Sequence, residues 1–106
     1  GCSAPEWQLY EKNKIISTCH LVDEGIDTGM IIDTMNLNVC YDNYHSFRAS
    51  IYPETSKFVL KIINHMIEHN GFKNLPVKQN KNHARYLKYI GDDIINEMKK
   101  NFFKFL

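Results

Sequence analysis

The chain has 106 residues, of which 43% are hydrophobic and 24% charged, the size and composition of one ordinary globular domain. Its formal net charge of +1 gives no strong attraction for nucleic acid or anionic membrane. No apolar run approaches the ~20 residues of a membrane span, so no membrane partner is expected. The three cysteines, Cys2, Cys19 and Cys40, form no C-x-x-C pair, which favours free thiols in a cytoplasmic protein.

Two β-strands are predicted in the first 40 residues. Residues 14–22 are rich in β-branched and apolar side chains, which favour a strand. Residues 23–29 consist largely of turn formers. Residues 30–39 then predict a second strand, whose imperfect alternation indicates that both faces are partly covered.

The hydrophobic period changes after Asn43, where helical spacing begins. Pro53 suits a first helical turn and Gly71 a helix stop, so we predict a helix over 53–70. A helical stretch over 44–51 is a weaker alternative upstream. The apolar positions at three- and four-residue spacing are Phe58, Val59, Ile62, Ile63, Met66 and Ile67.

The remaining residues predict a loop over 71–83 and a last helix capped by Asp92 or Asp93. That helix carries Ile94, Ile95, Met98 and Phe102. Two strands and two helices predict an α/β layer arrangement. Because two strands alone make a marginal sheet, the chain is expected to be an incomplete domain.

One continuous motif spans the first predicted strand, the turn and the start of the second strand. It runs Thr18-Cys19-His20-Leu21-Val22-Asp23-Glu24-Gly25-Ile26-Asp27-Thr28-Gly29-Met30-Ile31-Ile32. This string resembles the signature T-x-H-x-V-D-E-G-x-D-T-G-x-I-I of the 10-formyltetrahydrofolate-dependent formyltransferases, which include sugar-nucleotide, methionyl-tRNA and glycinamide ribonucleotide formyltransferases. Residues 1–7 resemble the family stretch that precedes it, and Ala84-Arg85-Tyr86-Leu87 is a weaker match to a C-terminal segment.

The resemblance implies the fold and organisation of the chain. Residues 1–106 would be the C-terminal part of a Rossmann-like formyltransferase catalytic domain, comprising its late strands and the helices that cover them. The N-terminal part, which carries the family's N-x-H motif, would be absent. The 106-residue chain is therefore expected to be inactive alone. A strand over 14–22 without its neighbour would present an unpaired edge, which also predicts self-association.

The resemblance further implies the chemistry and its residues. In the family, an amine attacks the formyl carbon of 10-formyltetrahydrofolate, and an Asp supports the His of N-x-H; by position this catalytic Asp is Asp27. A carboxylate beside an imidazole favours its protonated form, which suits general acid–base catalysis. Backbone groups of the loop would bind the pterin of the cosubstrate, and the loop residues are Val22, Asp23, Glu24, Gly25 and Ile26.

The residues of the motif resemble most closely the enzymes that formylate an amino sugar on a nucleotide, which implies such an acceptor. Nucleic acid would be a partner only if tRNA were the acceptor. The alternative of a different class is a non-catalytic domain that keeps the fold and binds a folate or a protein. His20, inside a predicted strand, is expected to be a structural histidine.

Three other patterns have structural alternatives. Asn43-Tyr44-His45 matches N-x-H but follows Asp27 instead of preceding it. His65-Met66-Ile67-Glu68-His69 matches the inverted zinc-protease pattern H-x-x-E-H, although a solvated helix end is the favoured interpretation and no metal is expected. The lysines and phenylalanines of 99–105 favour a packed amphipathic helix over a nucleic-acid patch.

Overall fold

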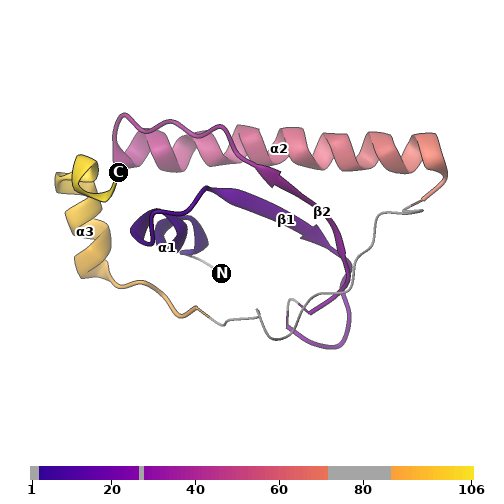
Figure 1. Ribbon diagram of the computed structural model, residues 1–106, viewed down its shortest axis with the longest axis horizontal. Helices are drawn as coiled ribbons and strands as arrows, with labels where there is room; N and C mark the ends of the chain where they lie inside the picture. The colour runs from indigo at the N-terminus through magenta and orange to yellow at the C-terminus, as the bar shows by residue number, and fades with distance from the viewer. Residues whose placement is uncertain (1–2, 27, 72–86) are drawn as a thin grey trace.

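The computed structural model describes residues 3–26, 28–71 and 87–106, and it contains both helices and a small sheet (Figure 1). The predicted loop of 71–83 and the segment Ala84–Leu87 therefore lie mostly outside the described residues. In chain order the elements are α1 (Ala4–Tyr10), β1 (Ile16–His20), β2 (Ile31–Asn36), α2 (Tyr44–His69), α3 (Asp92–Lys100) and a 3₁₀ helix (Phe102–Phe105). The fold is mixed α/β in the general sense that it combines helices with a two-stranded sheet.

The two strands pair with each other in antiparallel fashion and form a hairpin. Ile16 lies opposite Asn36 at one end, and the register shifts between Cys19 and His20, so that His20 lies opposite Ile31. Both predicted strands are confirmed, with shorter bounds than 14–22 and 30–39. The antiparallel arrangement follows from the short connection, since parallel strands need a crossover of a dozen or more residues.

Helix α2 begins nine residues before the predicted start at Pro53. The side chain of Asn43 accepts a hydrogen bond from the Ser46 N–H at 2.8 Å and caps the helix. Pro53 lies inside the helix, so its assignment to the first turn was wrong. Proline removes one backbone bond there, but the helix is held on both sides by a buried stripe of Tyr44, Phe47, Ile51, Phe58 and Ile62.

Helix α1 was not predicted, and it is held to α2 by a buried carboxylate. Glu6 is 2% exposed; its Oε1 accepts a hydrogen bond from the Tyr44 hydroxyl at 3.0 Å and forms an ion pair with Arg48, whose Nε lies 3.1 Å away. Burial of the phenol, together with the neighbouring Glu6 charge, raises the pKa of Tyr44. The polar contact thus joins two helices that are 38 residues apart in the chain.

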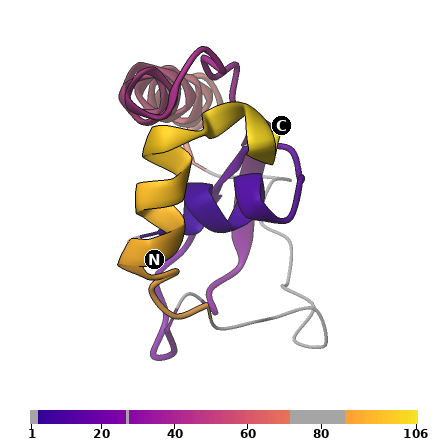
Figure 2. The ribbon, with the colours of Figure 1, turned by 90° about the vertical axis from the view of Figure 1, so that its left-hand side faces the viewer.

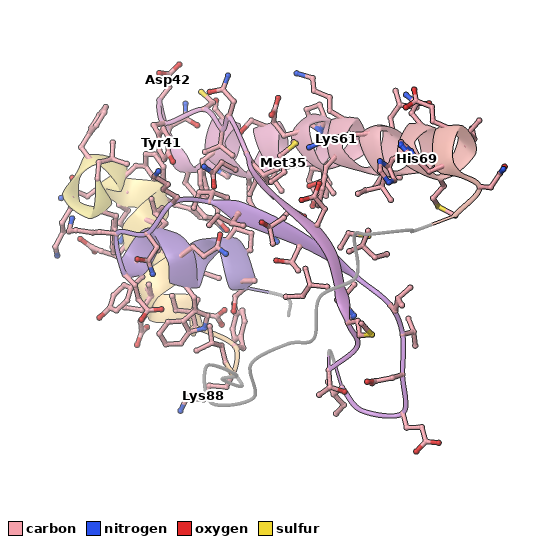
Figure 3. The ribbon with its side chains drawn as sticks, turned by 45° about the vertical axis from the view of Figure 1, so that its right-hand side comes forward. Met35, Tyr41, Asp42, Lys61, His69 and Lys88 are labelled. Atoms are coloured by element: carbon pink, nitrogen blue, oxygen red, sulfur yellow. The ribbon has the colours of Figure 1, made fainter. Side chains whose placement is uncertain are left out.

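Two hydrophobic clusters make up the core. The larger joins α1, the first half of α2, α3 and the 3₁₀ helix, which approach one another at the same end of the molecule (Figure 2). The smaller packs Ile32 against Phe58 and Ile62, with Cys19 and Met35 beside them. Met35 lies close to α2 in Figure 3.

The C-terminal segment confirms the packed helix expected there. Phe102 and Phe105 are buried in the larger cluster, whereas Phe103 is exposed. The predicted side-chain cap was wrong: Gly91 occupies the cap position with φ of 102°, and no side chain caps the helix. Asp92 and Asp93 instead lie in its first turn, where their negative charges interact favourably with the positive end of the helix dipole.

Within the described residues, no helix combines the length and the apolar character needed to cross a membrane.

Candidate functional site

The described residues of the signature, 18–26 and 28–32, lie in one hairpin that consists of β1, a connecting loop and β2. The loop is closed by a hydrogen bond from the Leu21 N–H to the Met30 carbonyl at 2.9 Å. The side chains of Val22 and Ile26 are 92% and 79% exposed. These two side chains give the loop an exposed apolar surface.

Asp23 shapes the loop with its side chain. One carboxylate oxygen, Oδ1, accepts from the Gly25 N–H at 2.9 Å and from the Thr28 hydroxyl at 2.6 Å. This is the local hydrogen bonding by which Asp stabilises a turn. Asp23 therefore has a structural role that does not require contact with a ligand through its side chain.

The two glycines of the loop lie where a Cβ atom would collide with neighbouring atoms. A Cβ on Gly29 would collide with the Leu21 carbonyl, which is backbone and cannot move without opening the hairpin. A Cβ on Gly25 would collide with the Thr28 hydroxyl, the end of a side chain that can rotate. The Asp-Glu-Gly and Thr-Gly parts of the motif are thus explained by the geometry of the turn.

Asp27, the predicted catalytic residue, lies outside the described residues, between Ile26 and Thr28. The other predicted loop residues, Val22 to Ile26, are described and lie together on this turn. His20 precedes them at the end of β1, half-buried, with its Nδ1 2.8 Å from the Leu21 carbonyl. A carbonyl only accepts, so Nδ1 carries the proton in this contact, as expected for a structural histidine.

A cavity of about 530 Å³ lies beside β1. Its lining includes Ile16, Thr18 and His20 of β1, Gln8 of α1 and Thr55 of α2, and among the described residues it does not include the loop from Val22 to Ile26. No sequence pattern indicated that Gln8 would line a cavity. Its contribution becomes visible only when α1 is placed against β1.

Two residues of the Asn43-Tyr44-His45 string have structural roles. Asn43 is the cap of α2, and Tyr44 is buried against Glu6. The Asn43 side chain is engaged with the Ser46 N–H and is therefore not available to flank a formyl group.

The histidines of the H-x-x-E-H pattern lie near the C-terminal end of α2, where Figure 3 places His69. The rings of His65 and His69 stack with centroids 4.1 Å apart and an interplanar angle of 18°. His69 Nδ1 is engaged with the His65 carbonyl at 3.0 Å. In the part of the chain that the structure describes, no third His, Cys, Asp or Glu joins them in a metal-binding group.

We expect protein purified without chelator to carry well under one zinc per chain, because a structural zinc takes four ligands and a catalytic one three. Metal analysis by mass spectrometry measures this directly, with His65→Ala as the matched variant. A stoichiometric zinc that is lost in His65→Ala would contradict the prediction.

Comparisons with known proteins identify no relative: no protein-family model, no curated protein and no solved structure matches the chain.

Proposed function

We propose that this chain supplies the Asp-bearing loop of an N-formyltransferase, which transfers the formyl group of 10-formyltetrahydrofolate to an amine, with an amino sugar nucleotide as the acceptor. The observation that carries the proposal is the hairpin that contains the described residues of the signature, 18–26 and 28–32. In that hairpin, Asp23 and Thr28 form the turn and Gly25 and Gly29 give it room.

The loop suits a flat, polar ligand. A pterin ring presents donors and acceptors along its edges, and a turn offers backbone N–H and C=O groups at fixed spacing. Because Asp23 holds the turn from within, the backbone from Val22 to Ile26 is shaped before a ligand binds. The exposed side chains of Val22 and Ile26 provide apolar surface beside the ring.

Asp27 supplies the charge in this proposal. In formyl transfer the acceptor nitrogen forms a bond to the formyl carbon, the bond from that carbon to the donor nitrogen breaks, and a proton lost by the acceptor nitrogen is replaced by one gained by the donor nitrogen. A carboxylate that favours a protonated imidazole helps to stabilise the tetrahedral oxyanion between these two events. Such a reaction takes place in the cytoplasm, where the folate cosubstrate and the reduced thiols of this chain are compatible.

Nuclear magnetic resonance of the ¹⁵N-labelled chain tests the loop directly. On titration with 5-formyltetrahydrofolate, the stable isomer of the donor, we expect the amide signals of Val22 to Ile26 to shift more than those of α3. The matched control ligand is p-aminobenzoylglutamate, which keeps the tail but lacks the pterin, and it should leave the loop signals in place. Loop signals unchanged at millimolar ligand, or shifts confined to other elements, would contradict the assignment of the loop.

A further inference from the structure

Helix α2 presents a continuous set of apolar side chains to solvent. They share an arc of about 100° round the helix, since each residue advances the helix by about 100°. Each of these side chains is at least 45% exposed. We call this set the outer face of α2, and its members are Tyr52, Val59, Leu60, Ile63 and Ile67.

The outer face is distinct from the side of α2 that forms the core. Phe58 and Ile62 pack against Ile32 of β2, and they point about 130° away from the outer face. Phe47 packs against Phe102 of the 3₁₀ helix, with ring centroids 5.6 Å apart, and it points to the side nearly opposite the outer face. The outer face therefore belongs to neither hydrophobic cluster.

The charged side chains of the same part of α2 lie on a third side. Glu54, Lys57, Lys61 and Glu68 are centred about 140° round the helix from the outer face. Lys57 Nζ lies 2.8 Å from Glu54 Oε1, and Lys61 Nζ lies 3.4 Å from Asp33 Oδ2. The helix thus has a polar side for water, and its outer face is a separate, uncharged surface.

The middle of the outer face is hollowed. The hollow has a volume of about 430 Å³ and is lined by Thr55, Ser56, Val59, Leu60 and Ile63. The last four stand at positions i, i+3, i+4 and i+7, the set that receives a side chain of a facing helix in coiled-coil packing. Ser56 is the smallest of them, and its hydroxyl donates to the Tyr52 carbonyl at 3.0 Å. It therefore gives the hollow depth without leaving an unpaired donor there.

We infer that the outer face of α2 binds the outer face of a second copy of this chain, with the two helices antiparallel and crossing near Leu60. A two-fold axis at the crossing places the apolar side chains of each copy against the hollow of the other. Such an interface is self-complementary, as closed dimers require.

Charge and shape support a second copy in this orientation. The outer face has no Lys, Arg, Asp or Glu, so the two copies bring no like charges together at the axis. The larger hydrophobic cluster gathers α1, α3 and the 3₁₀ helix at the N-terminal half of α2, whereas the C-terminal end of α2 projects beyond them (Figure 1). An antiparallel pair sets the bulky end of one copy beside the slender end of the other.

The area of the outer face is sufficient for a weak dimer. The exposed surface of its five side chains is on the order of 500 Å² per copy, so a pair would bury about 1,000 Å² in total, which is the lower limit for a specific interface. An interface of this size fits a Kd on the order of 10 micromolar.

Analytical ultracentrifugation of the 106-residue chain from about 1 to about 200 micromolar tests the inference, and we expect a monomer–dimer equilibrium. Val59→Lys and Ile63→Lys each place two like charges near the axis, so each should weaken the dimer by at least about tenfold. Both side chains are exposed in the monomer, so circular dichroism should show an unchanged fold.

Phe103→Lys is the matched control. Phe103 is 71% exposed, but it lies on the 3₁₀ helix, which packs through Phe102 on the side of α2 away from the outer face. Its replacement should change Kd by less than about threefold. A chain that stays monomeric at the highest concentration would overturn the inference and leave the outer face to a different partner. A dimer that Phe103→Lys weakens as much as Ile63→Lys would overturn it too, since that result indicates unspecific apolar association.

Disulfide cross-linking tests the orientation. Under mild oxidation, Leu60→Cys should give more linked dimer than the unsubstituted chain, because the two copies of residue 60 meet at the axis. Tyr52→Cys should not, because an antiparallel pair separates the two copies of residue 52 by about 24 Å along the helices, too far for a disulfide. Equal cross-linking by the two variants would indicate a parallel pair and contradict the crossing near Leu60.

Discussion

Replacing Asp27 with Asn is expected to lower kcat by about 10²–10⁴-fold in any form of this protein that transfers formyl groups. The amide keeps the size of the side chain and removes its charge, so the support of a protonated imidazole is lost. Binding of the folate should remain largely intact, because the carboxylate acts mainly in the transition state. Steady-state kinetics together with a folate titration separates the two effects.

Asp23→Asn provides the matched control, because it makes the same chemical change four residues away. Its Oδ1 can still accept from the Gly25 N–H and the Thr28 hydroxyl, so the loop should keep its shape and kcat should fall by less than about tenfold. Equal losses in the two variants, or a near-normal kcat in Asp27→Asn, would remove Asp27 from the mechanism.

Gly29→Ala is expected to lower the free energy of unfolding by at least about 3 kcal/mol, although it adds a single carbon. The new Cβ would occupy the place of the Leu21 carbonyl, and both the bond that closes the loop and the pairing beyond it depend on that segment. Urea unfolding followed by circular dichroism measures the loss.

Gly25→Ala adds the same carbon to the same loop and should cost only about 1 kcal/mol. Its neighbour is the Thr28 hydroxyl, which can turn away at the expense of one hydrogen bond to Asp23. If Gly29→Ala were as mild as Gly25→Ala, the close approach of Gly29 to Leu21 would not be a feature of the folded protein.

The sequence predicted those elements whose cause is local. β-branched residues before and after a run of turn formers predicted both strands, and the motif predicted the loop between them. The last helix was also predicted, although its cap was not. Within the loop, Asp23 and Gly25 are residue types that favour a turn, so a turn there could be predicted. The close approach of Gly29 to the Leu21 carbonyl could not.

Features that depend on tertiary contacts could not be predicted from the sequence. Pro53 favoured a helix start, but buried residues on both sides of it, Phe47 and Phe58 among them, extend α2 through the proline. Helix α1 has only seven residues, too few to be stable by propensity, and depends on contacts such as Glu6 with Tyr44 and Arg48. Val59 and Ile63 belong to the predicted apolar stripe but are exposed. The two-stranded sheet covers only part of the long helix α2.

The turn between β1 and β2 also bears on how descendants of this gene would diverge. Asp23, Gly25 and Thr28 are joined by hydrogen bonds and a close approach, and Gly29 lies close to the Leu21 carbonyl. Selection for folding alone would preserve them, even in a lineage that had abandoned catalysis. Under the proposed function, a branch in which residue 27 has changed while these four residues are kept would be one that retained the turn without the proposed catalytic carboxylate.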